Sequence, residues 1–178
     1  MITITASEFY GILKEDNIKE NELAALAVDK LIKSNKKVAT AESCTGGYVS
    51  KRITDVSGAS GVFECGVCSY ANRIKNKLLG VSEKTLSTVG AVSKETAGQM
   101  AEGVRKLADA DFGLSTTGIA GPTGGTADKP VGLVYMAVSS RGGTRLIKAM
   151  LGDAEDNSRE GIRSLACSVI LYYLYKSI

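Results

Sequence analysis

Residues 37–47 read Lys-Val-Ala-Thr-Ala-Glu-Ser-Cys-Thr-Gly-Gly, and this stretch decides the fold. Residues 37–42 alternate as a short strand does, and a helical pattern that includes Val49 and Ile53 follows the two glycines. A strand that passes through a glycine turn into a helix is typical of α/β proteins. The stretch therefore predicts that Ser43 leaves the end of a strand and enters the first turn of a helix.

The rest of the chain continues this alternation of strands and helices. Periodicity and turn residues predict strands at 61–70 and 112–119, a hairpin formed by 131–139 and 144–151, and helices at 22–33, 72–79, 93–108 and 158–175. The helix that Ser93 caps has an apolar stripe made of Ala97, Met100, Ala101, Val104, Leu107 and Ala108. We expect one three-layer α/β/α domain with a mixed β-sheet over residues 21–178, preceded by a loosely packed lead at 1–20 that has a short β-like start.

Composition excludes several classes of function. The 178 residues have a formal net charge of +3, too small to indicate nucleic acid or a membrane surface, although it suits an anionic small ligand. No apolar run reaches the ~20 residues that span a bilayer and no signal region opens the chain, so we expect a cytoplasmic protein. The sequence contains no histidine, which removes the Ser-His-Asp and Cys-His arrangements and the commonest metal ligand.

The turn after the first predicted strand can serve two kinds of chemistry. Free backbone N–H groups of Cys44, Thr45, Gly46 and Gly47 at a helix start suit either a phosphate or the oxyanion of a tetrahedral intermediate. The alternative is structural: Ser43 or Thr45 only caps the helix, and the glycines only allow close packing. The turn is not a P-loop, because no Lys-Ser/Thr pair follows the glycines.

A serine nucleophile in a chain without histidine needs another base. Lys75 lies about one turn into the helix predicted at 72–79, and Tyr70 ends the strand before it. A desolvated lysine can activate a serine when burial moves its pKa from ~10.4 toward neutrality. Lys77 is the rival on the same segment, and a solvated lysine is the structural alternative.

Three further features are candidates. Cys65 and Cys68 form a Cys-x-x-Cys inside a strand-like run, which predicts buried structural cysteines and neither a redox motif nor a zinc site. The glycine-rich segment 117–125 follows the end of a predicted strand, where ligands of α/β sheets gather, although a plain surface loop remains the alternative. Arg159 and Arg163 share a helix face and could clamp a phosphate, or they could be solvated.

These segments together resemble the CinA C-terminal domain family, whose members include nicotinamide-nucleotide amidases. The resemblance runs from about residue 20 to the end of the chain, and its motifs are Ala-Glu-Ser-Cys-Thr-Gly-Gly at 41–47, Tyr70 with Asn72 and Lys75, Gly-Ala-Val-Ser at 90–93, Gly-Ile-Ala-Gly-Pro at 118–122 and Lys-Pro-Val-Gly at 129–132. It implies an α/β/α fold, oligomers of identical chains, and a metal-free serine amidase that deamidates nicotinamide mononucleotide. No cofactor is implied.

The resemblance also implies residue roles. Ser43 matches the family nucleophile, and Tyr70 and Lys75 match its tyrosine and lysine. The substrate would be bound by residues of the turn, the glycine loop and the last helix, namely Cys44, Thr45, Gly46, Gly47, Asn72, Gly118, Gly121, Arg159 and Arg163. Larger members carry an additional nucleotide-pyrophosphatase domain, whose activity is not expected of these 178 residues.

Three positions depart from the family pattern. Ala71 stands where serine is common, Cys65 where arginine is common, and Ala154 where an arginine often follows Gly-Asp. These departures concern substrate affinity more than reaction type. Two other functions therefore stay open: a nucleotide- or protein-binding module without turnover, linked to competence or DNA damage, and an amidase that acts on a different small substrate.

Overall fold

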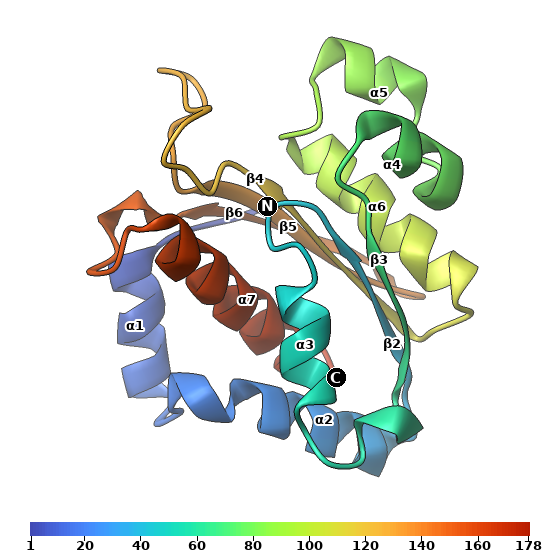
Figure 1. The fold of residues 1–178 in the computed structure, drawn as a ribbon. Helices are drawn as coiled ribbons and strands as arrows, with labels where there is room; N and C mark the ends of the chain where they lie inside the picture. Colours follow the sequence, from blue (N-terminus) through green and yellow to red (C-terminus); the bar gives the residue numbers. More distant parts are fainter.

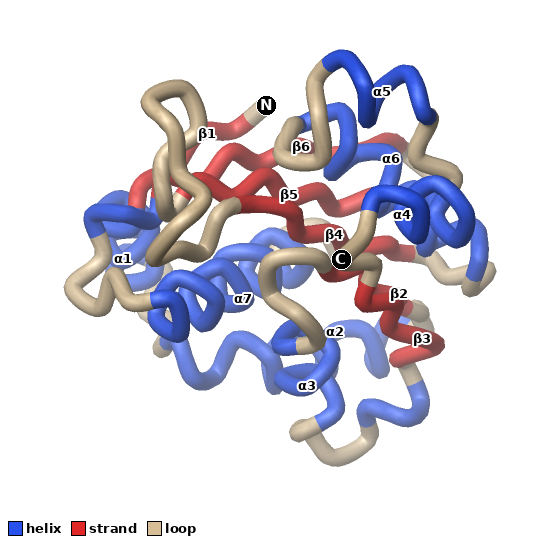
Figure 2. The backbone as a smooth tube through the Cα atoms, turned by 45° about the horizontal axis from the view of Figure 1, so that its top comes forward, coloured by secondary structure: helices blue, strands red, loops and turns tan.

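The computed structural model describes residues 1–178 and contains a six-stranded sheet between two layers of helices. The main elements, in chain order, are β1 (Ile2–Thr5), α1 (Ala6–Glu15), α2 (Leu23–Ser34), β2 (Val38–Glu42), α3 (Tyr48–Thr54), β3 (Phe63–Cys68), α4 (Asn72–Leu79), α5 (Glu83–Thr88), α6 (Lys94–Leu107), β4 (Phe112–Gly118), β5 (Leu133–Ser140), β6 (Gly143–Met150) and α7 (Arg159–Tyr175). Helices α1, α2, α3 and α7 cover one face, and α4, α5 and α6 lie on the other (Figure 1; Figure 2). This is the α/β/α architecture that the sequence predicts.

The sheet is mixed because one strand opposes the other five. Its order is β1-β6-β5-β4-β2-β3, and only the pairs of β5 with β4 and with β6 are antiparallel. The carboxyl ends of β2, β3 and β4, three neighbouring strands, therefore meet at one edge of the sheet. That edge is where ligands of open α/β sheets bind.

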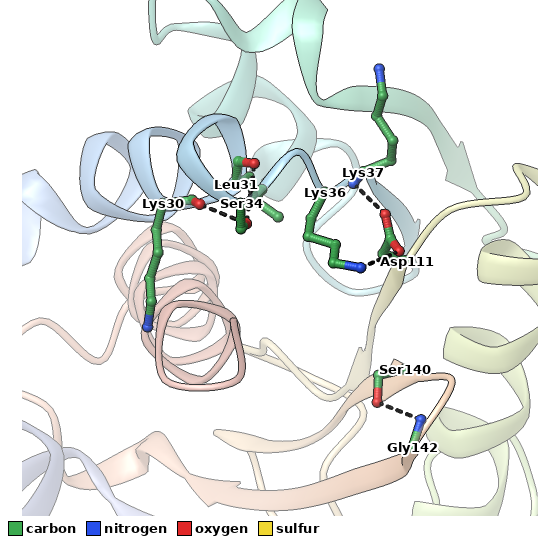
Figure 3. A network of polar contacts seen from close by, with 8 residues as sticks. All are labelled: Lys30, Leu31, Ser34, Lys36, Lys37, Asp111, Ser140 and Gly142. Carbon is green, nitrogen blue, oxygen red and sulfur yellow. Dashed lines mark hydrogen bonds and ion pairs between the residues drawn. The ribbon is translucent and has the colours of Figure 1, made fainter.

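A carboxylate fixes the opposite end of β2 against β4. Asp111 accepts a hydrogen bond from the Lys37 N–H at 2.9 Å and forms an ion pair with the Lys36 side chain at 3.0 Å (Figure 3). The register then runs from Val38 beside Phe112 to Glu42 beside Thr116. Because the pairing is set at the first residue of the strand, the position of its last residue, and of Ser43 after it, is set too.

Helix α7 forms the centre of the larger core. Ile162, Leu165, Ala166 and Val169 face inward as predicted, and eleven of its seventeen residues are buried. The predicted stripe of α6 is buried at Ala97, Met100, Ala101 and Val104, while Leu107 is 56% exposed. The expectation for Leu107 was wrong, since this last residue of α6 is exposed to solvent. None of the helices combines the length and apolarity needed to cross a membrane.

The first residues are not a loosely packed lead. Strand β1 pairs in parallel with β6, from Ile2 beside Ile147 onward. Helix α1 has a complete capping box at Thr5, and its Phe9 is fully buried against the ring of Tyr172 at 5.8 Å between centroids. The expectation was wrong because the partner of β1 lies more than 140 residues further along the chain. Helix α5 was not predicted either.

Candidate active site

The turn between β2 and α3 places Ser43 at the edge where three strands end. The Ser43 N–H donates to the Thr116 carbonyl of β4 at 3.0 Å, and the Ser69 N–H, just after β3, donates to the Glu42 carbonyl at 2.8 Å. The chain then turns through Gly46 and Gly47, whose φ angles of 60° and 99° are left-handed. Glycine adopts this conformation at little cost, so the local sequence permits the turn that presents Ser43.

Lys75 is the side chain that meets this serine. Its Nζ lies 2.9 Å from the Ser43 Oγ, 2.6 Å from the Ser69 carbonyl oxygen and 3.4 Å from the Tyr70 carbonyl oxygen. The residue is 1% exposed on the inner face of α4, whereas Lys77 is exposed to solvent. The structure thus pairs Ser43 with Lys75 and excludes Lys77 as the rival.

The surroundings of Lys75 favour its neutral form. Burial lowers the pKa of Lys75 below its ordinary value, and no carboxylate forms an ion pair with it. A neutral amine has two N–H bonds and one lone pair. The two carbonyl groups can only accept, so they take the two donors, and the lone pair is left for the Ser43 hydroxyl proton. This is the arrangement that a general base requires.

A pocket of about 250 Å³ opens in front of Ser43. Its walls come from the nucleophile turn, the end of β3, the segment after β4 and the start of α7, and they comprise Ser43, Cys44, Tyr70, Gly118, Ile119, Ala120, Gly121, Thr123, Gly124 and Arg159. The predicted glycine segment therefore does line the site. Larger hollows exist at Glu20–Arg52 and beside Lys176, but neither contains a paired nucleophile and base.

Gly118 and Gly121, the two predicted binding glycines of this segment, have no room for a side chain. A Cβ on Gly118 would lie 2.5 Å from the Leu133 carbonyl oxygen, and one on Gly121 would lie 2.5 Å from Val131 Cγ1. Gly121 also has a left-handed φ of 78°. The backbone of this wall therefore sits against the β5 end of the sheet, with its other side toward the pocket.

Arg159 supplies the one charged side chain of the pocket wall. Its guanidinium donates to the Gly121 carbonyl at 2.7 Å and to the Tyr70 hydroxyl at 3.2 Å. Tyr70 is 67% exposed, and its hydroxyl forms no hydrogen bond with Ser43 or Lys75. The tyrosine is thus held at the pocket mouth by Arg159, and only its backbone carbonyl contacts the lysine.

The four N–H groups of the turn do not behave alike. The Gly47 N–H, expected to be free, donates to the buried Glu42 carboxylate at 2.9 Å. Those of Cys44, Thr45 and Gly46 have no oxygen acceptor in the protein, and of these residues only Cys44 lines the pocket. The expectation for Gly47 was wrong because an internal carboxylate occupies the start of α3. The N–H groups of Cys44 and Thr45 lie against the Cys44 sulfur.

The thiol of Cys44 is not a nucleophile near neutral pH. Burial raises the pKa of the Cys44 thiol to about 12, so the thiol stays protonated near neutral pH. Cys65 and Cys68 alternate in direction along β3, and the exposed position of Cys68 contradicts the prediction that both are buried. The four cysteines are free, and no three Cys, Asp or Glu side chains gather as metal ligands would.

Five predicted binding residues lie outside the pocket, and Gly46 and Gly47 of the turn are two of them. The Thr45 hydroxyl is buried against Glu42 at 2.7 Å and points away from Ser43's pocket. Arg163 donates to the Thr45 carbonyl at 2.8 Å and lies over the Tyr48 ring, so it stabilises the turn instead of lining the pocket. Asn72 is exposed and forms no side-chain hydrogen bond. One turn of helix separates Arg159 from Arg163, and only the first reaches the pocket.

Two residues of the site were not singled out in the sequence. The carbonyl group of Ser69 binds Lys75, and its fully buried hydroxyl has no partner. Glu42 is 1% exposed and accepts hydrogen bonds from the Thr45 hydroxyl and from N–H groups at the start of α3. A signal for Glu42 was present, since a glutamate within a strand of otherwise small and apolar residues is seldom buried without partners.

Comparison with known proteins agrees with this architecture. The family model described as CinA C-terminal domain matches residues 20–178. A putative competence-damage inducible protein of Thermoanaerobacter sp. strain X514 is 51% identical over 157 residues, which is 88% of this chain and 38% of that protein. A protein of the same name from Acetivibrio thermocellus is 51% identical over 161 residues, 89% of this chain and 38% of that one. The chain thus spans 38% of the length of these curated relatives.

Solved structures agree as well. The competence/damage inducible protein of Agrobacterium tumefaciens superposes with a TM-score of 0.83 at 40% identity, over 87% of this chain and 93% of the other. A CinA superfamily protein of Escherichia coli superposes with a TM-score of 0.83 at 28% identity, over 90% and 91% of the two chains. With a family match over nearly the whole chain and relatives at half identity, the chain belongs to the CinA C-terminal domain family.

Proposed function

We propose that the chain is an amide hydrolase that deamidates nicotinamide mononucleotide through a covalent intermediate on Ser43. The observation that carries this proposal is the 2.9 Å contact between the Ser43 Oγ and the Nζ of the buried Lys75. A hydroxyl beside an amine of lowered pKa, at the bottom of a pocket, is the arrangement of serine amidases that work without histidine. The choice of substrate rests on the family resemblance.

The first stage forms the acyl-enzyme. Neutral Lys75 takes the hydroxyl proton as the Ser43 Oγ bonds to the carboxamide carbon, and the carbonyl oxygen becomes an oxyanion beside the Cys44 N–H. The oxyanion then collapses, the carbon–nitrogen bond breaks, and the proton held by Lys75 leaves with the amine as ammonia. One oxyanion donor of this kind contributes about 10²–10³ in rate.

The second stage repeats the same roles with water. Lys75, neutral again, takes a proton from a water molecule that attacks the ester carbon. The bond between Ser43 and the acyl group then breaks, and the proton returns to the serine oxygen. The products are nicotinic acid mononucleotide and ammonia, and the pair Ser43–Lys75 is restored.

Arg159 is the group that we assign to the anionic part of the substrate. It is the only charged side chain in the pocket wall, and two of its donors already anchor it to Gly121 and Tyr70. A guanidinium held in this way is well suited to a phosphate. Arg159→Ala should therefore raise KM for nicotinamide mononucleotide more than for nicotinamide riboside, which lacks the phosphate, and equal effects on the two would contradict this assignment.

The test of the proposed function is ammonia release from nicotinamide mononucleotide. Ser43→Ala and Lys75→Ala should each abolish turnover, whereas Lys77→Ala, an exposed lysine on the same helix, should leave it unchanged. The rate should rise with pH as Lys75 loses its proton, with a midpoint below the ordinary lysine value. A wild-type protein that binds the nucleotide without turnover would contradict the proposal, as would turnover of only a different amide.

A further inference from the structure

The carboxylate of Glu42 is the centre of the nucleophile turn. It belongs to the last residue of β2, directly before Ser43, and it is 1% exposed. One oxygen accepts from a hydroxyl and two backbone N–H groups, and the other accepts from the backbone and side chain of a single serine: Thr45 Oγ at 2.7 Å, Gly47 N at 2.9 Å and Val49 N at 3.1 Å on Oε2, Ser50 N at 2.8 Å and Ser50 Oγ at 2.7 Å on Oε1. No lysine or arginine pairs with it.

These contacts set the direction of a chain of hydroxyl groups. The single proton of Thr45 goes to Glu42, so the Thr116 hydroxyl, 2.6 Å away, must donate to Thr45. The proton of Ser50 also goes to Glu42, so the Thr40 hydroxyl, 2.8 Å away, must donate to Ser50. The carboxylate therefore orders polar groups from β2, β4 and α3 at once.

This arrangement requires that both terminal atoms of the side chain at position 42 accept hydrogen bonds. The amide of a glutamine would direct its NH₂ group either at the N–H groups of Gly47 and Val49 or at the N–H of Ser50. A backbone N–H cannot turn around to accept, so each orientation places donor against donor. The shape of the side chain is preserved in glutamine, and the hydrogen-bond pattern is not.

We propose that Glu42 is a positioning residue for the Ser43 nucleophile. By binding N–H groups at the start of α3, its carboxylate holds the turn in the shape that directs Ser43 toward Lys75. Glu42 touches neither Ser43 Oγ nor Lys75, so it acts through the turn. The inference rests on the proposed role of Ser43.

The experiment compares Glu42→Gln with the wild-type protein by two readouts. The first is kcat and KM for nicotinamide mononucleotide. The second is the rate at which a fluorophosphonate modifies Ser43, followed by mass spectrometry; the Ser43 oxygen–phosphorus bond forms, the phosphorus–fluorine bond breaks, and the serine proton passes to Lys75. Ser115→Ala is the matched control, because it also removes a buried hydrogen bond, from Ser115 to the Ala97 carbonyl of α6 at 2.6 Å, on the face of the sheet opposite to α3.

We expect Glu42→Gln to lower kcat and the labelling rate together by about 10²-fold, the cost of roughly 1 Å of misplacement, while KM changes little. The control should lose thermal stability without losing either rate. A folded Glu42→Gln protein whose two rates stay near those of the wild type would overturn the inference.

Three further outcomes are informative. If Glu42→Gln does not fold, Ser50→Ala decides, because it removes one donor from the carboxylate and leaves the backbone contacts; a labelling rate equal to that of Ser115→Ala would overturn the inference, and a lower one would support it. If the wild type is labelled but releases no ammonia, the proposed substrate fails, and the labelling rates alone test Glu42. A wild-type Ser43 that is not labelled at all overturns both.

Discussion

Replacing Gly103 by alanine should lower the rate of the reaction, although Gly103 does not line the pocket. Gly103 lies on α6, where it packs against the end of α4, the short helix that carries Lys75. A Cβ at this position would lie 1.9 Å from the Leu79 carbonyl oxygen, 2.7 Å from its carbonyl carbon and 3.0 Å from its Cα. All three are backbone atoms, so no side-chain rotation can relieve the clash.

The size of the displacement follows from these distances. Real Cβ contacts essentially never fall under 3.0 Å, so the 1.9 Å contact is at least about 1.1 Å too short. Leu79 is four residues after Lys75, and a rigid movement of α4 by this amount would lengthen the 2.9 Å contact between Lys75 Nζ and Ser43 Oγ to about 4 Å. That is beyond hydrogen-bond reach, and a misplacement of about 1 Å can cost about 10²-fold in rate.

The assay measures both consequences of Gly103→Ala. Overpacking should lower the free energy of unfolding by about 1–3 kcal/mol in a urea titration. Ammonia release should lose about two orders of magnitude in kcat. Gly98→Ala on the same helix is the control, because its Cβ would meet only the tip of the Leu146 side chain at 3.3 Å. A Gly103→Ala protein with the stability and kcat of the wild type would refute this reasoning.

Three other predictions concern burial. Lys75→Met should abolish turnover. Folding lowers the pKa of Lys75, so the folded wild type binds fewer protons at this residue than the unfolded chain does. In urea titrations the free energy of unfolding of the wild type relative to this variant should therefore rise from pH 7 toward pH 10.5, by at most about 1.4 kcal/mol per pH unit. Phe9→Ala should cost about 3–5 kcal/mol in the same assay, whereas Ala at the 44%-exposed Tyr10 should cost about 0.5 kcal/mol or less. Burial raises the pKa of Cys44 and of Cys167 to about 12, so iodoacetamide at neutral pH should modify neither thiol until the chain unfolds, and mass spectrometry would detect earlier modification.

The sequence predicts best what is local. Residues 37–47 contain the strand, the glycine turn and the start of the helix within one stretch, and β2 and α3 form there. The helix at 72–79 has the predicted bounds because Gly80 adopts the left-handed conformation that ends it. The absence of histidine pointed to a lysine base for Ser43, and the family resemblance indicated Lys75, whereas the residues alone left Lys77 open.

What the sequence could not predict depends on distant partners. The place of helix α1 in the core depends on Tyr172, and that of strand β1 depends on β6, both near the other end of the chain. Arg159 and Arg163 look equivalent along the sequence, but the pocket reaches only the first. In the sequence Glu42 is only the end of a strand, and the Thr45 hydroxyl and N–H groups at the start of α3 surround its carboxylate only in the folded chain.

The pairing of β1 with β6 also bears on how the chain assembles. Ile2 is the register partner of Ile147, so this edge of the sheet cannot close until nearly the whole chain is available. Contacts so far apart in sequence are slow to form, because the intervening loop must first be ordered. During synthesis β1 therefore stays unpaired, and Phe9 of α1 stays exposed, until β6 and Tyr172 have emerged from the ribosome. The strands β2, β3 and β4, which carry the nucleophile, can pair well before that.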